Sequence, residues 1–225
     1  MLPRILEPEV MDTAEEARDY DGMDHSHVNQ LFVADFLKLG ATAESVLDVG
    51  TGTAQIPIAL CQAHPTIHVI AIDLAKEMLA VGRQNVERAG LAERIELQLI
   101  DAKAMPFADA SFDAVISNSI VHHIPEPFAV FVEMTRVVKN GGVIFVRDLL
   151  RPKSIAQLDG FVRTYAGDAN AHQQKMFSES LHAALTLDEV KDLVQRVGHD
   201  PANVKQTSDR HWTWADCSRS PKASG

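Results

Sequence analysis

The fold is decided by residues 46–54, VLDVGTGTA, where a short β-rich run ends in Gly50 and Gly52. Glycines at such a turn let the backbone bend sharply and let a ligand approach the main chain. A helical pattern follows, so the free N–H groups at the start of a helix would point at the same place. This stretch therefore predicts a strand, a ligand-binding turn and a helix.

Outward from this turn, short apolar runs alternate with helical stretches. The runs typical of strands are residues 45–49, 68–72, 95–100, 112–117 and 143–149, and the helical stretches between them are residues 54–63, 75–89 and 127–138. Alternation at this spacing gives right-handed βαβ crossovers, and hence a parallel sheet covered on both faces. Two further strands, 203–207 and 211–217, follow each other so closely that they must pair antiparallel. We therefore expect an α/β, doubly wound, mostly parallel sheet.

Several segments lie outside this alternation. Residues 1–22 are expected to form a loose arm, and residues 24–39 a helix. Residues 150–185 break the rhythm with two short helices, 154–166 and 171–184, which are either a lid over a site or a plain connection. A capping box at Thr186 and Glu189 then starts another helix. We expect one domain over residues 1–217 and a polar tail at 218–225.

The composition excludes several classes of protein. Of the 225 residues, 46% are hydrophobic and 23% are charged, which is typical of a globular domain. A formal net charge of −10 repels phosphate backbones and anionic lipid, so we expect neither a nucleic-acid nor a membrane partner. Cys61 and Cys217 are too far apart for a redox or zinc motif. No secretory leader or membrane span is recognisable, which favours a cytoplasmic monomer or homodimer.

Carboxylates stand at the ends of three successive predicted strands. Asp48 precedes Gly50 by two residues, Asp73 ends the second strand, and Asp101 follows the third. A carboxylate at the end of the second strand can accept hydrogen bonds from both hydroxyls of a ribose. A dinucleotide fingerprint would need a third glycine at position 55, which is Gln55. Asp48 would also repel a diphosphate, whereas a ligand with a cationic group would be attracted.

Together these features resemble the class I S-adenosylmethionine-dependent methyltransferases, in the branch of the ubiquinone and menaquinone methyltransferases. The matching residues are 47–52 (LDVGTG), Asp73, 101–102 (DA), 112–118 (FDAVISN) and 136–142 (RVVKNGG, with Asn140 in place of the usual Pro). The resemblance spans residues 41–149 and 186–217. It implies a seven-stranded sheet of order 3-2-1-4-5-7-6 with strand 7 antiparallel. It also implies transfer of a methyl group from S-adenosylmethionine to a small-molecule acceptor, with S-adenosylhomocysteine as product.

The resemblance implies a role for each matching residue. Gly50, Thr51 and Gly52 would lie against the amino-acid part of the cofactor, whose ammonium group Asp48 would face, and Asp73 would hold the ribose. The residues expected around the adenine are Leu74, Met78, Asp101 and Ala102, and those near the methionine part are Asn118 and Ser119. The N-terminal helix would close over the cofactor through candidates among Tyr20, His25, Asn29 and Phe32.

His122 and His123 are the catalytic candidates, because they follow the fourth strand at the same edge of the sheet. A neutral imidazole there can accept a proton from the methyl acceptor, which is needed only if the acceptor has one to lose. Adjacent side chains diverge, so we expect one of the two to face the pocket; a purely structural role for both stays open. No sequence spacing suggests a metal site, so we expect none.

The acceptor itself is not specified. The residues suited to a small polar or aromatic acceptor in the inserted segment are Tyr165, His172, Phe177, Ser180 and His182, which are equally compatible with ordinary helix packing. The alternating Trp212 and Trp214 favour core packing. Three other functions stay open: an NAD-type oxidoreductase, a non-catalytic cofactor-binding protein on the same fold, and a different reaction with the same cofactor.

Overall fold

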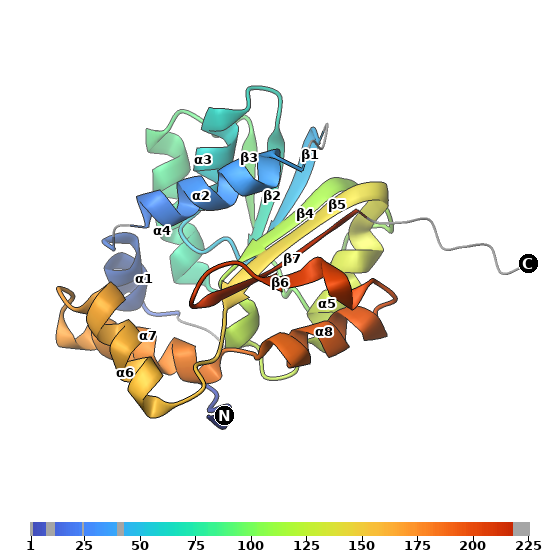
Figure 1. Cartoon of the computed structure of the whole chain (residues 1–225). Coiled ribbons are helices and arrows are strands. Elements are labelled where there is room, and N and C mark those ends of the chain that lie inside the picture. The colour runs from blue at the N-terminus through green and yellow to red at the C-terminus, as the bar shows by residue number, and fades with distance from the viewer. Residues whose placement is uncertain (1, 8–11, 24, 40–42, 218–225) are drawn as a thin grey trace, which may run out of the picture.

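A computed structural model describes residues 2–7, 12–23, 25–39 and 43–217 (Figure 1). Its seven-stranded sheet has the order β3-β2-β1-β4-β5-β7-β6. The strands are β1 (Ser45–Val49), β2 (His68–Asp73), β3 (Ile95–Leu99), β4 (Phe112–Asn118), β5 (Val138–Leu149), β6 (Val204–Gln206) and β7 (His211–Cys217). Strands β1 to β5 are parallel, and β7 runs antiparallel to both β5 and β6. The predicted fold class, strand order and antiparallel strand 7 are confirmed.

Helices cover both faces of the sheet, because alternate strand residues are buried on opposite sides. One face carries α2 (Ser26–Leu37), α3 (Gln55–Ala63) and α4 (Lys76–Arg88), and the other carries α5 (Phe128–Val137) and α8 (Leu187–Arg196) (Figure 1). On β5, for example, Phe145 packs with Phe32 of α2, whereas Ile144 and Val146 belong to the core on the α5 and α8 side. The two faces therefore hold separate cores.

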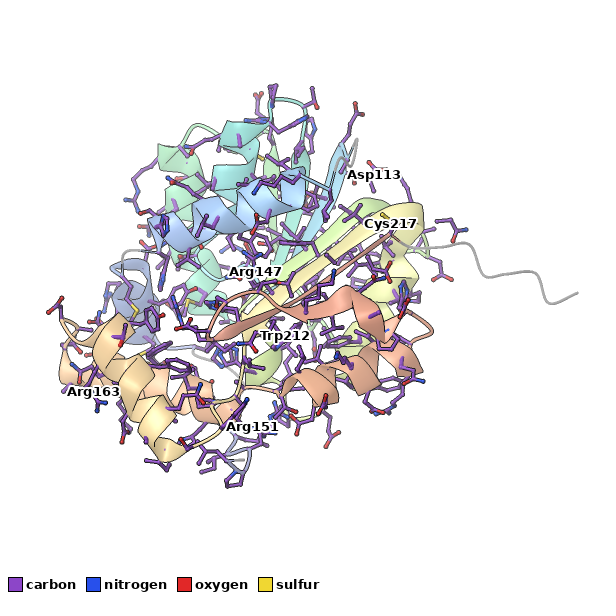
Figure 2. All side chains as sticks on the ribbon, viewed as in Figure 1. Asp113, Arg147, Arg151, Arg163, Trp212 and Cys217 are labelled. Carbon is purple, nitrogen blue, oxygen red and sulfur yellow. The ribbon has the colours of Figure 1, made fainter. Side chains whose placement is uncertain are left out.

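Both tryptophans are core residues. Trp212 and Trp214 of β7 are fully buried, and the Trp214 ring stacks on Phe131 of α5 at 5.4 Å between centroids. Figure 2 shows Trp212 and, on the adjacent strand, Arg147, which bonds across the opposite face to Asp35 of α2 at 2.9 Å. Core packing, as predicted, accounts for the tryptophans.

Strand β5 begins earlier than expected. The predicted strand was 143–149, whereas the observed strand starts at Val138 and includes Gly141, which has a φ of +79°. The pairing with β4 shifts register between Phe112 and Ala114, so the turn at 139–142 is an irregularity within the strand. A Cβ on Gly142 would lie 2.7 Å from the Asp113 carbonyl oxygen, which explains a glycine there.

The N-terminal region is more ordered than a loose arm. Residues Ala14–Asp21 form helix α1, which starts with a capping box between Thr13 and Glu16. Ala17 is fully buried against Ala75 and Met78 at the start of α4. The expectation of a loose arm is wrong for these residues because a local cap and this small apolar contact fix the helix.

The inserted segment forms the two expected helices, α6 (Ile155–Ala166) and α7 (Ala171–Ala183). They lie together with α1, at the end of the molecule away from Asp113 and Cys217 (Figures 1 and 2). Their own small core joins Leu149, Leu158, Leu181 and Ala184, with Leu2 packed against it. The N-terminal residues thus pack on the insertion.

The capping box predicted at the start of α8 can be tested by mutation. The Thr186 hydroxyl accepts from the Glu189 N–H at 3.3 Å, and the Glu189 carboxylate accepts from the Thr186 N–H at 2.7 Å. We expect Thr186→Ala to lower the free energy of unfolding by about 1 kcal/mol in urea denaturation. The exposed Thr164→Ala in the last turn of α6 is the control and should cost nothing. An equal effect in both variants would show that the cap does not stabilise α8.

Candidate active site

A pocket opens at the carboxyl ends of β1, β2 and β4. Its lining includes eleven of the predicted site residues: Tyr20, Gly50, Gly52, Asp73, Leu74, Met78, Asp101, Ala102, Asn118, Ser119 and His123. The side chains that the sequence analysis did not include are Ile72, Ala75, Ile100, Lys103, Ile120 and Ile124. Ligands of open α/β sheets bind at this edge, where the crossovers diverge. The structure therefore brings most of the predicted residues into one cavity.

The glycine turn after β1 forms the floor of the pocket. Gly50 and Gly52 have φ values of +76° and +55°, in the left-handed region that other residues adopt rarely. A Cβ on Gly50 would lie 2.0 Å from the Ile120 Cγ2, so the turn after β4 closes directly onto this glycine. Ser119 also has a positive φ, +59°, and its N–H donates to the Arg147 carbonyl oxygen. Two turns with left-handed backbone thus meet at the pocket, one at glycines and one at Ser119.

Asp73 connects the two loops at the pocket rim. Its carboxylate accepts from the Gly52 N–H at 2.7 Å and from the Ala75 N–H at 2.8 Å. Burial raises its pKa, against the lowering effect of these hydrogen bonds. A carboxylate oxygen can accept more than one hydrogen bond, so both oxygens keep capacity for a ligand hydroxyl.

Asp48 lies beneath the pocket floor rather than in its lining. It is 2% exposed, and its Oδ2 has no hydrogen-bond partner among the described residues. Burial raises its pKa to about 7, and the nearby charge of Asp73 adds to this, while the adjacent Thr51 hydroxyl opposes it. Thr51, also predicted at the cofactor, is buried beside it. An unpartnered buried carboxylate fits a ligand that brings positive charge.

The far side of the pocket combines apolar and acidic groups. Met78 is buried, whereas Leu74 is 40% exposed at the pocket edge. The Asp101 carboxylate accepts from the Lys103 N–H at 2.9 Å and lies 3.2 Å from the Lys103 Nζ. An apolar wall with one acceptor at its end can hold a flat heteroaromatic ring with an amino group.

The N-terminal helix contributes through α1 rather than α2. Tyr20 of α1 lines the pocket, and its pKa is raised to about 12 by burial and by the charges of Asp73, Asp48 and Asp21. Asn29 of α2 does not line this pocket; its Nδ2 donates to the Gln55 Oε1 at 3.1 Å.

The other candidates near α2 also lie outside the pocket lining. Phe32 is buried against Phe145, and the His25 ring lies 4.9 Å from the Tyr20 ring. Gln55, the residue that replaces the third glycine of a dinucleotide motif, donates to Asp21 and accepts from Asn29. It therefore joins α1, α2 and α3.

The two catalytic candidates have different surroundings. His122 is 2% exposed, and its Nδ1 lies 2.5 Å from the Asp148 Oδ1. Burial alone would lower its pKa, but the charge and hydrogen bond of Asp148, with the charge of Glu7, outweigh burial and raise it. His123 lines the pocket. Of the pair, His123 is therefore the one placed to meet a ligand.

Glu7 approaches both histidines from the N-terminal segment. Its Oε1 lies 3.1 Å from the His123 Nδ1 and 3.6 Å from the His122 Nε2. Burial would raise the pKa of Glu7, but the contacts of its carboxylate with His123 and His122 lower it. These three ligand atoms lie within 4.8 Å of one another, a set that could hold a metal ion.

Sequence reasoning missed Glu7 and Asp148. We expected no metal site because the sequence shows no ligand spacing, and Glu7 lies far from the histidines along the chain. Asp148 gave a usable signal, since a charged residue inside the apolar run 143–149 is costly unless it is paired. Glu7 gave none, because only the fold brings it to the site.

The polar residues of the insertion do not line the pocket. The Tyr165 hydroxyl bonds to Asp209, and its ring lies under the Arg210 guanidinium. His172 is 4.0 Å from Asp19, and Phe177 packs on the small core of α6 and α7. His182 accepts the Ile5 N–H through its carbonyl oxygen. Ser180 alone touches the site, through Glu7 at 3.4 Å.

Ionisation of Asp48 predicts a pH-dependent cost in stability. An acid whose pKa is raised on folding destabilises the folded state increasingly as pH rises from its unfolded value to its folded value, here from about 4 to about 7. We expect Asp48→Asn to raise the melting temperature more at pH 8 than at pH 5, by an added stability of up to about 3 kcal/mol. The exposed Asp159→Asn is the control. A gain that is the same at both pH values would contradict the buried charge.

His122 is expected to be structural, and its stabilisation should depend on pH in the opposite sense. Removing one member of a buried ion pair costs about 3–5 kcal/mol because its partner stays buried. His122→Ala should therefore destabilise the protein much more than His123→Ala in thermal unfolding. Because the pKa of His122 is raised on folding, this difference should be full below about pH 6.5 and should shrink as pH rises. Equal losses in the two variants would contradict the assignment.

Comparison with known proteins identifies the family of the chain. A family model described as a methyltransferase domain matches residues 47–146. The demethylmenaquinone methyltransferase of Porphyromonas gingivalis is 31% identical over 176 residues, which cover 73% of this chain and 71% of that protein. The biotin biosynthesis bifunctional protein BioHC of Teredinibacter turnerae is 32% identical over 164 residues, but these cover 71% of this chain and only 27% of that protein.

Solved structures show the same architecture. A putative methyltransferase from Bacillus halodurans aligns with a TM-score of 0.58 at 26% identity, over 77% of this chain and 70% of that one. A putative S-adenosylmethionine-dependent methyltransferase from Methanococcus maripaludis aligns with a TM-score of 0.72 at 16% identity, over 97% and 99%, which shows the fold alone. No helix in the described ranges is long and apolar enough to cross a membrane. The chain belongs to the class I S-adenosylmethionine-dependent methyltransferases, and its cofactor is S-adenosylmethionine.

Proposed function

We propose that this methyltransferase methylates a small-molecule acceptor in the pocket at the carboxyl edge of β1, β2 and β4. The observation that carries the proposal is the set of carboxylates around the glycine turn. Asp73 and Asp101 line the cavity and Asp48 lies unpartnered beneath it. This arrangement offers acceptors for ribose hydroxyls and an amino group, and negative charge for a cationic ligand.

The residues present fit the cofactor. Gly50 and Gly52 give the amino-acid moiety access to the main chain, and Asp48 balances its ammonium group from below. Asp73 would accept the ribose hydroxyls, while Met78, Leu74 and Asp101 would hold the adenine. Asn118 and Ser119 border the methionine part. When bound, S-adenosylmethionine supplies an electrophilic methyl group on a sulfonium.

Alignment and exclusion of water are then the main tasks of the protein. Ile120 closes over Gly50, and Tyr20 covers Gly52. A Cβ added to Gly52 would lie 3.7 Å from the Tyr20 Cε1. The Tyr20 hydroxyl, whose pKa is raised to about 12, is protonated at neutral pH and can donate a hydrogen bond to a ligand in the pocket. His123 is the candidate proton acceptor for an acceptor that loses a proton, whereas His122 is turned away to Asp148.

Three observations support a small acceptor. The chain's net charge of −10 disfavours nucleic acid and anionic membranes. The insertion, which we propose lies at the acceptor side, adds only two helices of twelve and thirteen residues. Relatives are named as methyltransferases of demethylmenaquinone and, in Cereibacter sphaeroides, of phosphatidylethanolamine. We propose a cytoplasmic enzyme, monomeric or dimeric.

Calorimetric titration with S-adenosylhomocysteine tests the site, with NADH as the control ligand. We expect micromolar binding of the first and none of the second, because Asp48 repels a diphosphate. Binding of NADH would replace the proposal by an oxidoreductase. If neither ligand binds, the proposed cofactor-binding residues are wrong.

The same titration tests Asp73. Asp73→Ala should weaken binding of S-adenosylhomocysteine by about 1–3 kcal/mol, because ribose hydroxyls lose their acceptor. That corresponds to roughly 5- to 150-fold. The exposed Glu87→Ala on α4 is the matched control, and melting temperatures check that both variants fold. Unchanged affinity in a folded Asp73→Ala would contradict its role.

A further inference from the structure

The N-terminal segment carries a carboxylate to the one histidine that lines the pocket. We propose that Glu7 is a positioning residue, which holds His123 through its Nδ1 and leaves Nε2 to take a proton from the methyl acceptor. This inference rests on the proposed function and narrows it to acceptors with a proton to lose, such as a hydroxyl, thiol or amine. It gives residues 4–7 a role in the active site.

Residues 4–7 are held firmly against the active-site loop. The Arg4 side chain donates to four carbonyl oxygens, those of His122, Ile124, Pro125 and Ala183, at 2.7–3.1 Å. The Ile5 N–H donates to the His182 carbonyl oxygen at 3.2 Å. These bonds join the N-terminal segment to η1 (Val121–His123) on one side and to the end of α7 on the other. Glu7 follows directly, so its position is set by backbone contacts on both sides.

Glu7 is placed to act on His123. Its side chain is 10% exposed, and its Oε1 lies 3.1 Å from the His123 Nδ1, an ion-pair contact between two buried atoms that lacks the alignment of a hydrogen bond. A carboxylate beside one ring nitrogen of a histidine selects the tautomer with the proton on that nitrogen, and the opposite nitrogen is then a free acceptor. The Ser180 hydroxyl, 3.4 Å from the Glu7 Oε2, steadies the second oxygen.

The charged groups around His123 come from several elements. Glu7 lies on the N-terminal segment, His122 on η1, Asp148 at the end of β5 and Asp73 at the end of β2. Tyr20 lies on α1 across the pocket, and the Arg4 guanidinium is bound to the backbone of the same loop. The carboxylate in contact with the ring is that of Glu7.

The same atoms suggest a metal site, but the surrounding charges favour the carboxylate–histidine pair. His122 lies between two carboxylates, those of Asp148 and Glu7, which favours its protonated form. A protonated imidazole has no lone pair for a metal. The Arg4 cation at the same loop further disfavours a divalent ion.

The chemical step balances without another reactant. A bond forms between the acceptor atom and the methyl carbon while the sulfur–methyl bond breaks and leaves its electron pair on sulfur. The proton of the acceptor goes to the His123 Nε2. His123 then returns it to solvent when the products leave.

Nitrogen-15 NMR of histidine-labelled protein tests the proposal without knowledge of the acceptor. The two ring nitrogens of each histidine have different shifts and couplings in the two neutral tautomers, and His123→Gln assigns the resonance. We expect His123 to be predominantly the Nδ1–H tautomer in the wild type. Glu7→Ala should lose this preference, and Glu7→Gln should keep part of it because an amide oxygen in the same place attracts the Nδ1–H dipole without carrying a charge. Glu126→Ala, an exposed carboxylate on the next loop, should leave it unchanged.

Other outcomes would overturn the proposal. A predominant Nε2–H tautomer of His123 in the wild type would do so, as would an unchanged tautomer in Glu7→Ala. If one equivalent of Zn²⁺ binds chelator-treated protein and shifts both His122 and His123, the cluster is a metal site instead. Binding of S-adenosylhomocysteine, measured on the same samples, separates failure of this inference from failure of the proposed function.

Discussion

The geometry of the active site depends on one buried carboxylate, that of Asp148 at the end of β5. It is fully buried, and its oxygens accept hydrogen bonds from the N–H groups of Val121 and Leu149 and from the His122 ring. Such a group is stable only because its partners are complete. Asp148 therefore ties the turn after β4 to the adjacent strand.

The hydrogen bonds of Asp148 position the residues of the turn after β4. Ile120 closes onto Gly50, which leaves no space for a side chain there. His123 reaches the pocket because its neighbour His122 is turned the other way. Arg4 donates hydrogen bonds to carbonyl oxygens of the same turn. The N-terminal segment therefore docks on a turn that Asp148 holds in place. A single buried interaction thus links the cofactor turn, the candidate base and Glu7.

The parts of the fold that could be predicted are those with local causes. Strand and helix periodicity, the capping box at Thr186 and the glycine turn are readable within a few residues, and parallel crossovers bring the ends of β1, β2 and β4 together. The antiparallel β7 followed from the short connection to β6. Asp73 and Asp101 were predictable because the first ends β2 and the second closely follows β3 at this edge.

The contributions that could not be predicted arise from contacts distant in sequence. Glu7 reaches the site only because Arg4 binds the loop after β4 and the end of α7. Tyr20 was predicted at the site, but its helix α1 was not, because eight residues give too little periodicity. Asn29 was expected at the cofactor because the resemblance implies that the N-terminal helix closes over it, whereas the Asn29 amide donates to Gln55.

The charges of the pocket suggest how binding and release are linked. Burial, with the added effect of nearby carboxylates, raises the pKa values of Asp48 and Tyr20. Lys103, a cation in the pocket lining, lies beside Asp101. The carboxylates of the pocket attract a ligand that carries a sulfonium and an ammonium group. Methyl transfer removes the sulfonium charge, so the product is attracted less than the cofactor. The negative charge that favours binding of the cofactor therefore also favours replacement of the product by a new cofactor molecule. The same negative charge disfavours an anionic acceptor beside the reacting methyl group.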